Sequence, residues 1–300
     1  MAKYYSVKSV VNGKMVKVPF LQSVGMNKPA NQKLNLANAM ADIRKLQKMF
    51  NFLLRHNPYE LRPYQTSIDE NGINDGGYFV QLIAAFQKNQ NIQGAERQQT
   101  VVLQNGPTIQ KLSALVMDIQ CTTQTPQNAV DLMKLPEVRA MMETTAWAEG
   151  TNDNYHKLVN GKVIKTPISK YQKFIGQHSK EVPISLDRHP EIYIEWAKGE
   201  KLSTAAGRYQ FLHETWEEMR KPYWLTDFGP WSQDIAVVGK FIEKKMIRPL
   251  LLGEYSTAVR RGNHTWASFP ESPYNQHPKS MDEFIGALKQ NLNRFSYLDG

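Results

Sequence analysis

The segment Thr144-Thr-Ala-Trp-Ala-Glu-Gly150 is the most informative one for the fold of the second half of this chain. We expect it to end a helix that begins at Leu135-Pro136-Glu137, because proline is favoured in the first helical turn and an acidic side chain suits the positive end of the helix dipole. Gly150 is placed to stop that helix, since glycine readily takes the left-handed conformation that follows a helix end. Glu149 therefore lies in the last turn.

The carboxyl group of Glu149 is predicted to have a raised pKa. Helical periodicity puts Glu149 on one face with Met142, Thr145 and Ala146, at the edge of an apolar stripe, with Trp147 close by. Partial burial disfavours the carboxylate, and the negative end of the helix dipole acts in the same direction. An acid still protonated near neutral pH can donate the proton that a leaving sugar oxygen needs. By itself, however, the segment more often marks a solvated glutamate at a helix end.

Two later segments carry side chains that suit a sugar. Ser203-Thr-Ala-Ala-Gly207-Arg-Tyr-Gln-Phe211 combines small residues, where backbone can approach a ligand, with a polar and aromatic cluster. Trp266-Ala-Ser-Phe-Pro270-Glu-Ser-Pro-Tyr274-Asn-Gln276 is typical of an irregular loop with exposed aromatic and amide side chains. The alternatives are a glycine turn before a core helix and a loop anchored by core aromatics. The candidate substrate-binding residues are Ser203, Gly207, Arg208, Tyr209, Gln210, Trp266, Tyr274 and Gln276.

Together these segments resemble the lambda-type phage endolysins, which are lytic transglycosylases with a lysozyme-like fold. The resemblance covers about residues 136 to 290, and its ordered motifs are more specific than any one alone. It implies that Glu149 is the catalytic acid, that Gly207 to Gln210 lies along the sugar cleft and that the partner is bacterial peptidoglycan. The matching stretches are Ala146-Trp-Ala-Glu-Gly-Thr151, Ser203-Thr-Ala-Ala-Gly-Arg-Tyr-Gln-Phe-Leu212, Asp227-Phe-Gly-Pro-Trp-Ser-Gln-Asp234, Trp266-Ala-Ser-Phe-Pro270 and Tyr274-Asn-Gln276.

The carboxylates near Glu149 bear on the type of reaction. A hydrolase of the usual kind needs two carboxylates that flank the bond, and Asp153 is the only nearby candidate for the second. The family pattern has Asp directly after Glu-Gly-Thr, whereas here Asn152 intervenes, which puts a role for Asp153 in doubt. The resemblance implies instead that one glutamate protonates the leaving oxygen and then helps the C6 hydroxyl of muramic acid close a 1,6-anhydro ring. A muramidase that uses water is the alternative. Ser185-Leu-Asp187-Arg188 and Glu214, Glu217 and Glu218 are interpreted as surface or helix-face residues.

Length and composition favour two ordinary folded domains. The chain has 300 residues, 41% of them hydrophobic and 22% charged. One cysteine, Cys121, excludes an intramolecular disulfide, and the seven histidines form no cluster at zinc spacing, so we expect no metal and no cofactor. The N-terminus lacks the apolar stretch of a secretory signal, and no run approaches the roughly 18 apolar residues that span a bilayer. We expect a monomer without stable membrane insertion.

The domain boundaries follow from local patterns. Residues 1–120 are predicted to form a first domain, 121–132 a linker without hydrophobic period, and 133–300 a mainly helical catalytic domain of α+β class with a lysozyme-like fold. In this second domain an irregular insertion is expected over 151–188. Helices are expected at 190–198, 209–220, 231–247, 253–261 and 280–293.

The first domain is predicted to hold a β-hairpin over Tyr4–Phe20, turning at Asn12-Gly13, and three small helices. The helices are indicated by apolar periods behind Asp42, after the Gly72–Gly77 turn, and at Pro107 to Leu115. Residues 25–115 resemble the small three-helix peptidoglycan-binding domain of cell-wall hydrolases. Such a domain tethers the enzyme to an insoluble polymer. The hairpin lies outside this resemblance.

The positive charge is concentrated in the first domain. Residues 1–130 carry 14 Lys and Arg against 7 Asp and Glu, within a net charge of +9 for the whole chain. Such a region is drawn to polyanions, either nucleic acid or an anionic bacterial envelope, or is simply a solvated basic surface. We favour the envelope and no nucleic acid, because the resemblance points to the cell wall.

Three interpretations follow from these patterns. The first is a phage endolysin made in the host cytoplasm, which reaches the periplasmic cell wall through a membrane lesion made by another protein and lyses the host. The second is a secreted antibacterial effector or virion-associated lysin with the same chemistry, in which the hairpin serves for docking. The third is a non-enzymatic binding protein for glycan or nucleic acid, in which Glu149 is incidental.

Overall fold

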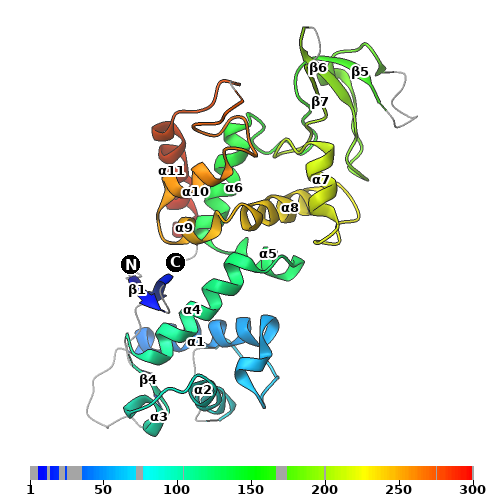
Figure 1. The fold of residues 1–300 in the computed structure, drawn as a ribbon. Helices are drawn as coiled ribbons and strands as arrows, with labels where there is room; N and C mark the ends of the chain where they lie inside the picture. The colour runs from blue at the N-terminus through cyan, green and yellow to red at the C-terminus, as the bar shows by residue number, and fades with distance from the viewer. Residues whose placement is uncertain are drawn as a thin grey trace. The chain divides into compact units, whose positions relative to one another are not determined.

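The chain forms two compact units in a computed structural model, Met1–Gln120 and Cys121–Gly300 (Figure 1). Each unit is described by itself. The described residues are 6–11, 14–19, 24–25, 36–71, 77–103, 105–166, 174–198, 201–274 and 276–298.

The first unit begins with paired strands. Strands β1 (Ser6–Val11) and β2 (Lys14–Pro19) run antiparallel, with Val11 opposite Lys14. The expected turn at Asn12-Gly13 lies outside the described residues, as does most of the expected Gly72–Gly77 turn. A second short pair joins β3 (Val24–Gly25) to β4 (Val101–Val102).

The helices of the first unit enclose an aromatic core. Phe50 of α1 (Leu36–His56) contacts Phe79 and Phe86 of α2 (Tyr78–Asn89) edge to face, with ring centroids 5.9 and 5.7 Å apart. The predicted third helix, to Leu115, runs further in the structure, because Val116 and Met117 are also buried. A short helix and a 3₁₀ turn occupy spacers that carried no periodic signal. The elements are α1 (Leu36–His56), η1 (Pro58–Leu61), α2 (Tyr78–Asn89), α3 (Ala95–Gln99) and α4 (Pro107–Thr122).

A buried carboxylate fixes the start of α4. Glu96 is nearly inaccessible to solvent, and its oxygens accept hydrogen bonds from the backbone N–H of Leu103 at 2.7 Å and from that of Thr108 at 2.8 Å. The Thr108 hydroxyl donates a further bond at 2.7 Å. A buried charge is tolerated when it is satisfied in this way, so Glu96 links α3 to α4.

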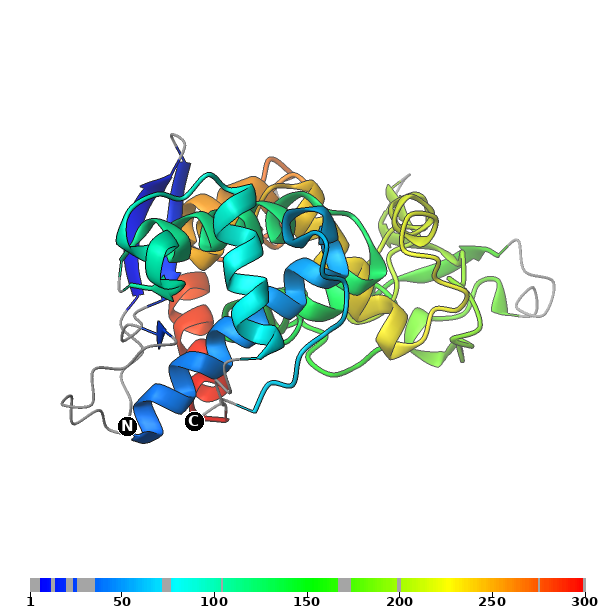
Figure 2. The same cartoon turned by 90° about the horizontal axis from the view of Figure 1, so that it is seen from below.

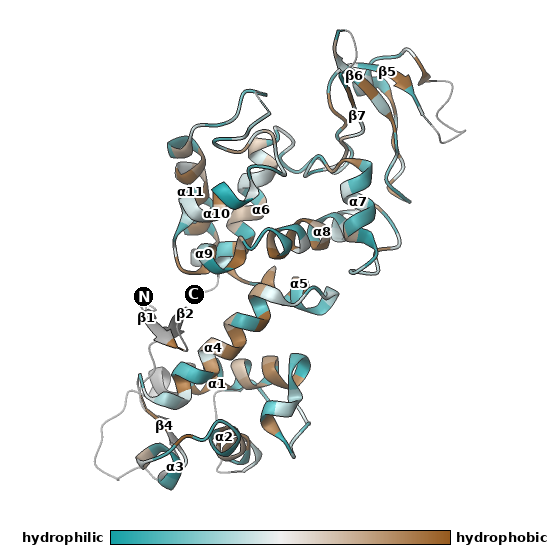
Figure 3. Ribbon diagram, in the orientation of Figure 1, coloured by the Kyte–Doolittle hydropathy of each residue, from teal (hydrophilic) through white to brown (hydrophobic). Residues whose placement is uncertain are grey.

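The second unit is built around α8 (Pro230–Glu243), which is rich in hydrophobic residues (Figure 3). Its residues from 235 to 242 are all buried, as expected for a helix surrounded by others. Helices α5 (Pro126–Leu132), α6 (Pro136–Ala148) and α7 (His213–Arg220) all pack against α8. The remaining helices complete this mainly helical unit. They are α5 (Pro126–Leu132), α6 (Pro136–Ala148), α7 (His213–Arg220), α9 (Ile247–Leu251), α10 (Tyr255–Gly262) and α11 (Met281–Leu298).

A three-stranded antiparallel sheet lies beside α7 (Figure 1). Figure 2 shows from a second direction that this sheet lies at the side of the second unit away from α11. Its order is β5 (Lys162–Lys165), β6 (Tyr193–Ala197) and β7 (Lys201–Ser203). The helix expected at 190–198 is therefore wrong. Ile192 and Ile194 are buried while their neighbours are more exposed, which is the two-residue period of a strand. The 151–188 insertion is also less irregular than expected, because β5 and the η3 turn (Ser179–Glu181) form within it.

The linker expected at 121–132 is corrected by the structure. Its second half is helix α5, whose Thr125 side chain accepts a hydrogen bond from Asn128 N–H at 3.3 Å and so caps the helix start. Ala129 and Leu132 of this helix are fully buried in the second unit. Only 123–125 is non-helical between α4 and α5. The polar composition of 121–132 gave no indication of this capped helix.

Neither a bilayer-spanning helix nor a cluster of potential metal ligands occurs in the part of the chain that the structure describes.

Candidate active site

Glu149 is held at the C-terminal end of α6 by a specific helix stop. The N–H of Thr151 donates to Ala146 O and the N–H of Gly150 donates to Trp147 O, both at 3.0 Å. Gly150 has φ +68°, the left-handed conformation that this Schellman arrangement requires. Glu149 itself occupies the capping position, with its N–H bonded to Thr145 O. The expected helix end is therefore observed.

Glu149 is partly buried, and among the described residues the side chain of Ser268 is hydrogen-bonded to its carboxyl. Ser268 Oγ donates a hydrogen bond of 2.5 Å to Glu149 Oε1. Burial raises the pKa of Glu149 from 4.5 to about 7, against the smaller opposing effect of the Ser268 hydrogen bond. This agrees with the direction expected from the sequence. A large share of the molecules therefore carry the proton at neutral pH, and it resides on Oε2, since Oε1 accepts from Ser268.

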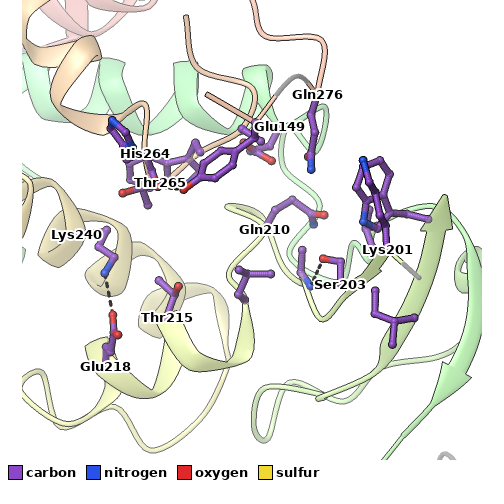
Figure 4. Close-up of a pocket in the computed structure, with 18 of the residues that line it drawn as sticks. Glu149, Lys201, Ser203, Gln210, Thr215, Glu218, Lys240, His264, Thr265 and Gln276 are labelled. Carbon is purple, nitrogen blue, oxygen red and sulfur yellow. Dashed lines mark hydrogen bonds and ion pairs between the residues drawn. The ribbon is translucent and has the colours of Figure 1, made fainter. Parts of the chain in front are cut away.

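Glu149 lines a cavity of about 650 Å³ in the second unit (Figure 4). The cavity is bounded by α7 and α8, by the β6–β7 hairpin and by the loop after α10. Figure 4 shows Gln210 between Lys240 and Glu218 on one side and Lys201 on the other. Such a cavity is of the size that binds small organic ligands. Its described lining includes Glu149, Trp196, Lys201, Leu202, Ser203, Gln210, Glu218, Lys240, Lys244, His264, Trp266, Tyr274 and Gln276.

Five of the eight predicted substrate-binding residues lie on this lining. Ser203, Gln210, Tyr274 and Gln276 are accessible, and Tyr274 is 50% exposed. Trp266 also borders the cavity but is only 3% exposed. The exposure expected for Trp266 is therefore wrong. Its ring stacks on Phe269 with centroids 4.9 Å apart, and its indole N–H donates to Tyr209 O at 3.2 Å, so it mainly supports the wall.

Gly207, Arg208 and Tyr209 do not line the cavity, contrary to expectation. Gly207 has φ +79°, and a Cβ there would lie 2.2 Å from Gln233 Oε1. Tyr209 is completely buried and its hydroxyl donates to Asp234 Oδ1 at 2.7 Å. The reason is a tight turn, in which Ala206 and Phe211 exchange backbone hydrogen bonds. Within that turn only Gln210 presents its side chain to the cavity.

Arg208 is the centre of a buried charge network. Its side chain is 4% exposed and lies 2.7 Å from Glu143 Oε2 and 3.0 Å from Asp153 Oδ1. Asp234 lies 3.8 Å away. Arg208 Nε also donates to Asn152 O at 2.8 Å. The guanidinium thus holds the segment after Glu149 to the turn that carries Gln210, and acts on the site through position rather than contact.

The structure also settles where Asp153 points. Its side chain is 89% exposed, forms an ion pair with Arg208 and is absent from the cavity lining. Among the described residues, the carboxylates on the lining are those of Glu149 and Glu218. Glu218, interpreted from the sequence as a helix-face residue, is paired with Lys240 at 3.1 Å. Lys240 sits on α8, so the packing of α7 on α8 brings Glu218 to the cavity.

Several residues of this site carried no signal in the sequence. Ser268 lay inside a predicted loop, and Trp196 lay in a segment expected to be helical. Lys201 and Lys240 are ordinary lysines in the sequence. Assigning 193–197 to a strand would have been a first indication that Trp196 belongs to the site, because a strand there places Trp196 beside the Ser203 segment. The Ser268 contact spans 119 positions and has no local signature.

The comparison with known proteins decides the family. The sequence profile of the Endolysin family matches residues 139–294, just over half of the chain and all within the second unit. The chain belongs to the endolysin family. The endolysin of Escherichia phage lambda is 30% identical over 152 residues, covering 51% of this chain and 89% of that protein. The endolysin of Escherichia phage P2 is 30% identical over 151 residues, covering 49% and 88%.

Two solved structures also resemble this endolysin. One is the lysozyme of bacteriophage lambda complexed with a chitohexasaccharide, which is 28% identical, with a TM-score of 0.42, and covers 52% of this chain and 94% of that one. The other is a second structure of the phage lambda lysozyme, 23% identical with a TM-score of 0.38, covering 55% and 96%. The endolysin is thus a peptidoglycan-cleaving enzyme.

Proposed function

We propose that this endolysin is a lytic transglycosylase whose general acid and base is Glu149. It cleaves the β-1,4 bond between N-acetylmuramic acid and N-acetylglucosamine and leaves 1,6-anhydromuramic ends. The observation that carries this proposal is the cavity lining, where Glu149 is the one described carboxylate that no cation neutralises. A conventional hydrolase needs two carboxylates across the bond.

The chemistry proceeds in two steps at one side chain. Glu149 Oε2 gives its proton to the O4 oxygen of the leaving N-acetylglucosamine as the bond to muramic C1 breaks, which a pKa of about 7 permits at neutral pH. The resulting carboxylate accepts the proton of the muramic C6 hydroxyl while O6 bonds to C1. The proton returns to Glu149, and no water is consumed. Ser268 holds the carboxyl in one orientation through both steps.

The products test this directly. Digestion of purified walls and mass spectrometry of the muropeptides should show anhydromuramic ends, and reducing ends would contradict the proposal. Glu149→Gln keeps the shape of the side chain and removes its proton, so it should abolish cleavage. Undiminished lysis by that variant would remove Glu149 from the mechanism altogether.

A muramidase is the second candidate, because Glu218 lines the same cavity. In that mechanism Glu218 would activate water opposite Glu149. The carboxylate of Glu218 is, however, engaged in its ion pair with Lys240, whereas that of Glu149 is not paired with a cation. Glu218→Gln should leave the rate within about threefold of wild type if transfer is intramolecular, whereas loss of a general base costs about 10²-fold or more.

We further propose that Met1–Gln120 binds peptidoglycan and that the endolysin acts on the periplasmic wall after synthesis in the host cytoplasm, as a monomer. The compact aromatic core of this unit and the positive charge of its sequence support a separate tethering module. Full-length Glu149→Gln protein should sediment with insoluble walls, and a separately made 1–120 chain with a folded circular dichroism spectrum should compete with it. Failure to compete would assign wall binding to the second unit alone.

A further inference from the structure

The β6–β7 hairpin forms a wall of the cavity that no comparison assigns a role. Trp196, Lys201 and Leu202 all border the cavity there. Glu195 pairs with Leu202 and Ala197 with Lys201, so Trp196 is an extra residue of a β-bulge in β6. A bulge redirects side chains and is frequent next to active sites. It explains how an indole comes to border the same cavity as Ser203.

The wall is apolar and cationic together. Leu202 is 49% exposed and contributes apolar surface to this wall. The ammonium of Lys201 lies 5.4 Å from the centre of the Trp196 ring, a cation–π contact that restrains the long lysine side chain. The indole ring of Trp196 and the ammonium group of Lys201 therefore border the cavity together.

Lys201 differs from the two other lysines on the lining. Lys240 pairs with Glu218 and Glu243, and Lys244 pairs with Glu243. Lys201 has no carboxylate partner among the residues that the structure describes. A restrained cation without a counter-charge, at the edge of a ligand cavity, is a site for an anionic group of the ligand.

We infer that Trp196 and Lys201 form a subsite for a muramoyl unit in which the indole covers the apolar face of the sugar and the ammonium pairs with a carboxylate carried by that unit. This inference rests on the proposed function for its substrate class and adds a selectivity to it. Muramoyl units carry carboxylates either on the peptide stem or, once the stem is removed, on the lactyl ether. A neutral chitin chain carries neither.

The test uses the full-length enzyme and soluble, uncross-linked glycan strands in three forms. The first form keeps its peptide stems and their carboxylates. The second has been stripped by an amidase and carries only lactyl carboxylates. The third has every carboxylate converted to a neutral methylamide. Initial rates give kcat/KM for each form, and each variant is compared with the wild-type enzyme, which carries the same first unit.

Lys201→Gln should lower kcat/KM by about tenfold on an acidic form and change it by less than about twofold on the methylamide form. The acidic form whose kcat/KM falls in Lys201→Gln shows whether Lys201 pairs with a carboxylate of the peptide stem or with the lactyl carboxylate. Lys201→Arg should retain most of the activity, and the Lys201 effect should shrink in about 0.5 M NaCl because salt screens an exposed pair. Lys162→Gln, in the same sheet but away from the cavity, is the matched control. Equal effects of Lys201→Gln on the acidic and neutral forms, or none on either, would overturn the carboxylate assignment.

Trp196→Ala should lower kcat/KM on all three forms, and Trp196→Phe should restore part of the loss, because the stacking surface is independent of charge. Trp224→Ala, which removes an 81% exposed tryptophan outside the cavity, is its control. An unchanged Trp196→Ala enzyme would overturn the sugar-stacking role. The same digests report the product ends. Reducing ends would contradict the transglycosylase proposal and leave the Lys201 comparison valid.

Discussion

Ser268 Oγ lies 2.5 Å from Glu149 Oε1 and donates a hydrogen bond to it, although the two residues are 119 positions apart in the chain. The contact joins the end of α6 to the loop after α10. It takes up one carboxyl oxygen and so leaves the other for the transferable proton. The loop therefore decides which oxygen of Glu149 is the acid.

Replacing Ser268 by alanine should move the basic limb of the pH profile upward. The Ser268 hydrogen bond lowers the pKa of Glu149, so its loss lets burial raise that pKa above about 7. Glu149 acts first as an acid, and activity falls as pH rises through its pKa. The limb of kcat/KM should therefore shift to higher pH by about 0.5 to 1 pH unit. Ser268→Thr keeps a donor and should hold the limb in place, and a downward shift in Ser268→Ala would contradict the assignment.

Glu149→Gln should stabilise the second unit at high pH. The pKa of Glu149 is raised from 4.5 to about 7 on folding, so its stability contribution is full below pH 4.5 and is lost as pH rises through 7. A neutral glutamine loses nothing with pH. Relative to wild type, the variant should therefore gain on the order of 3 kcal/mol above pH 7 and close to nothing below 4.5.

Urea unfolding of the Cys121–Gly300 transition at several pH values measures this difference. Glu181→Gln, at an exposed position of the same unit, is the control variant. A gain for Glu149→Gln that does not grow between pH 4.5 and 7 would disprove the burial of a protonated acid.

Gly207→Ala should destabilise the second unit more than an ordinary left-handed glycine replacement. The new Cβ would meet Gln233 Oε1 at 2.2 Å and Phe228 at 2.9 Å, in addition to the strain of φ +79°. We expect a loss of about 3 kcal/mol. Gly253→Ala, with φ +73° and its nearest neighbour at 4.0 Å, isolates the backbone strain and should lose about 1 kcal/mol. Thermal unfolding compares the two, and equal losses would contradict the clash.

Arg208 and Asp153 should respond very differently to substitution. Arg208→Ala leaves Glu143 and the largely buried Asp234 without their cation, so the loss should be about 3 to 5 kcal/mol. Asp153→Asn removes only the 89% exposed partner of Arg208, whose charge water screens, so the loss should be at most about 1 kcal/mol. Its kcat should stay within about threefold of wild type, since the carboxylate points away from the cavity. A hundredfold fall in kcat for Asp153→Asn would make it the second carboxylate after all.

The helix end at Gly150 and the raised pKa of Glu149 were predictable because their causes are local. A helix stop at a glycine depends only on the neighbouring residues. An apolar stripe at helical spacing also buries the residue at its end, which here is Glu149. The same reasoning failed for 190–198. There charged residues flank Ile192 and Ile194, and helical and strand periods differ little over so short a run.

For the candidate site, what the sequence did not predict is the direction in which individual side chains point. Gly207 to Gln210 was recognised as one segment, yet only Gln210 borders the cavity, because the turn at Ala206 and Phe211 points Arg208 and Tyr209 inward. The sequence offers no way to see that Glu143 and Asp234 would be the partners of Arg208, since they lie on α6 and α8.

The sequence by itself determined the helix that ends at Glu149, the acid that closes it, and the family to which that pattern belongs. Short-range hydrogen bonds and periodic burial are sufficient for those. The tertiary structure was needed to show that Ser268 occupies one oxygen of Glu149, that Asp153 faces solvent, and that a bulge brings Trp196 with Lys201 to the cavity. Each of these depends on how helices and strands pack together, and no local pattern encodes that packing.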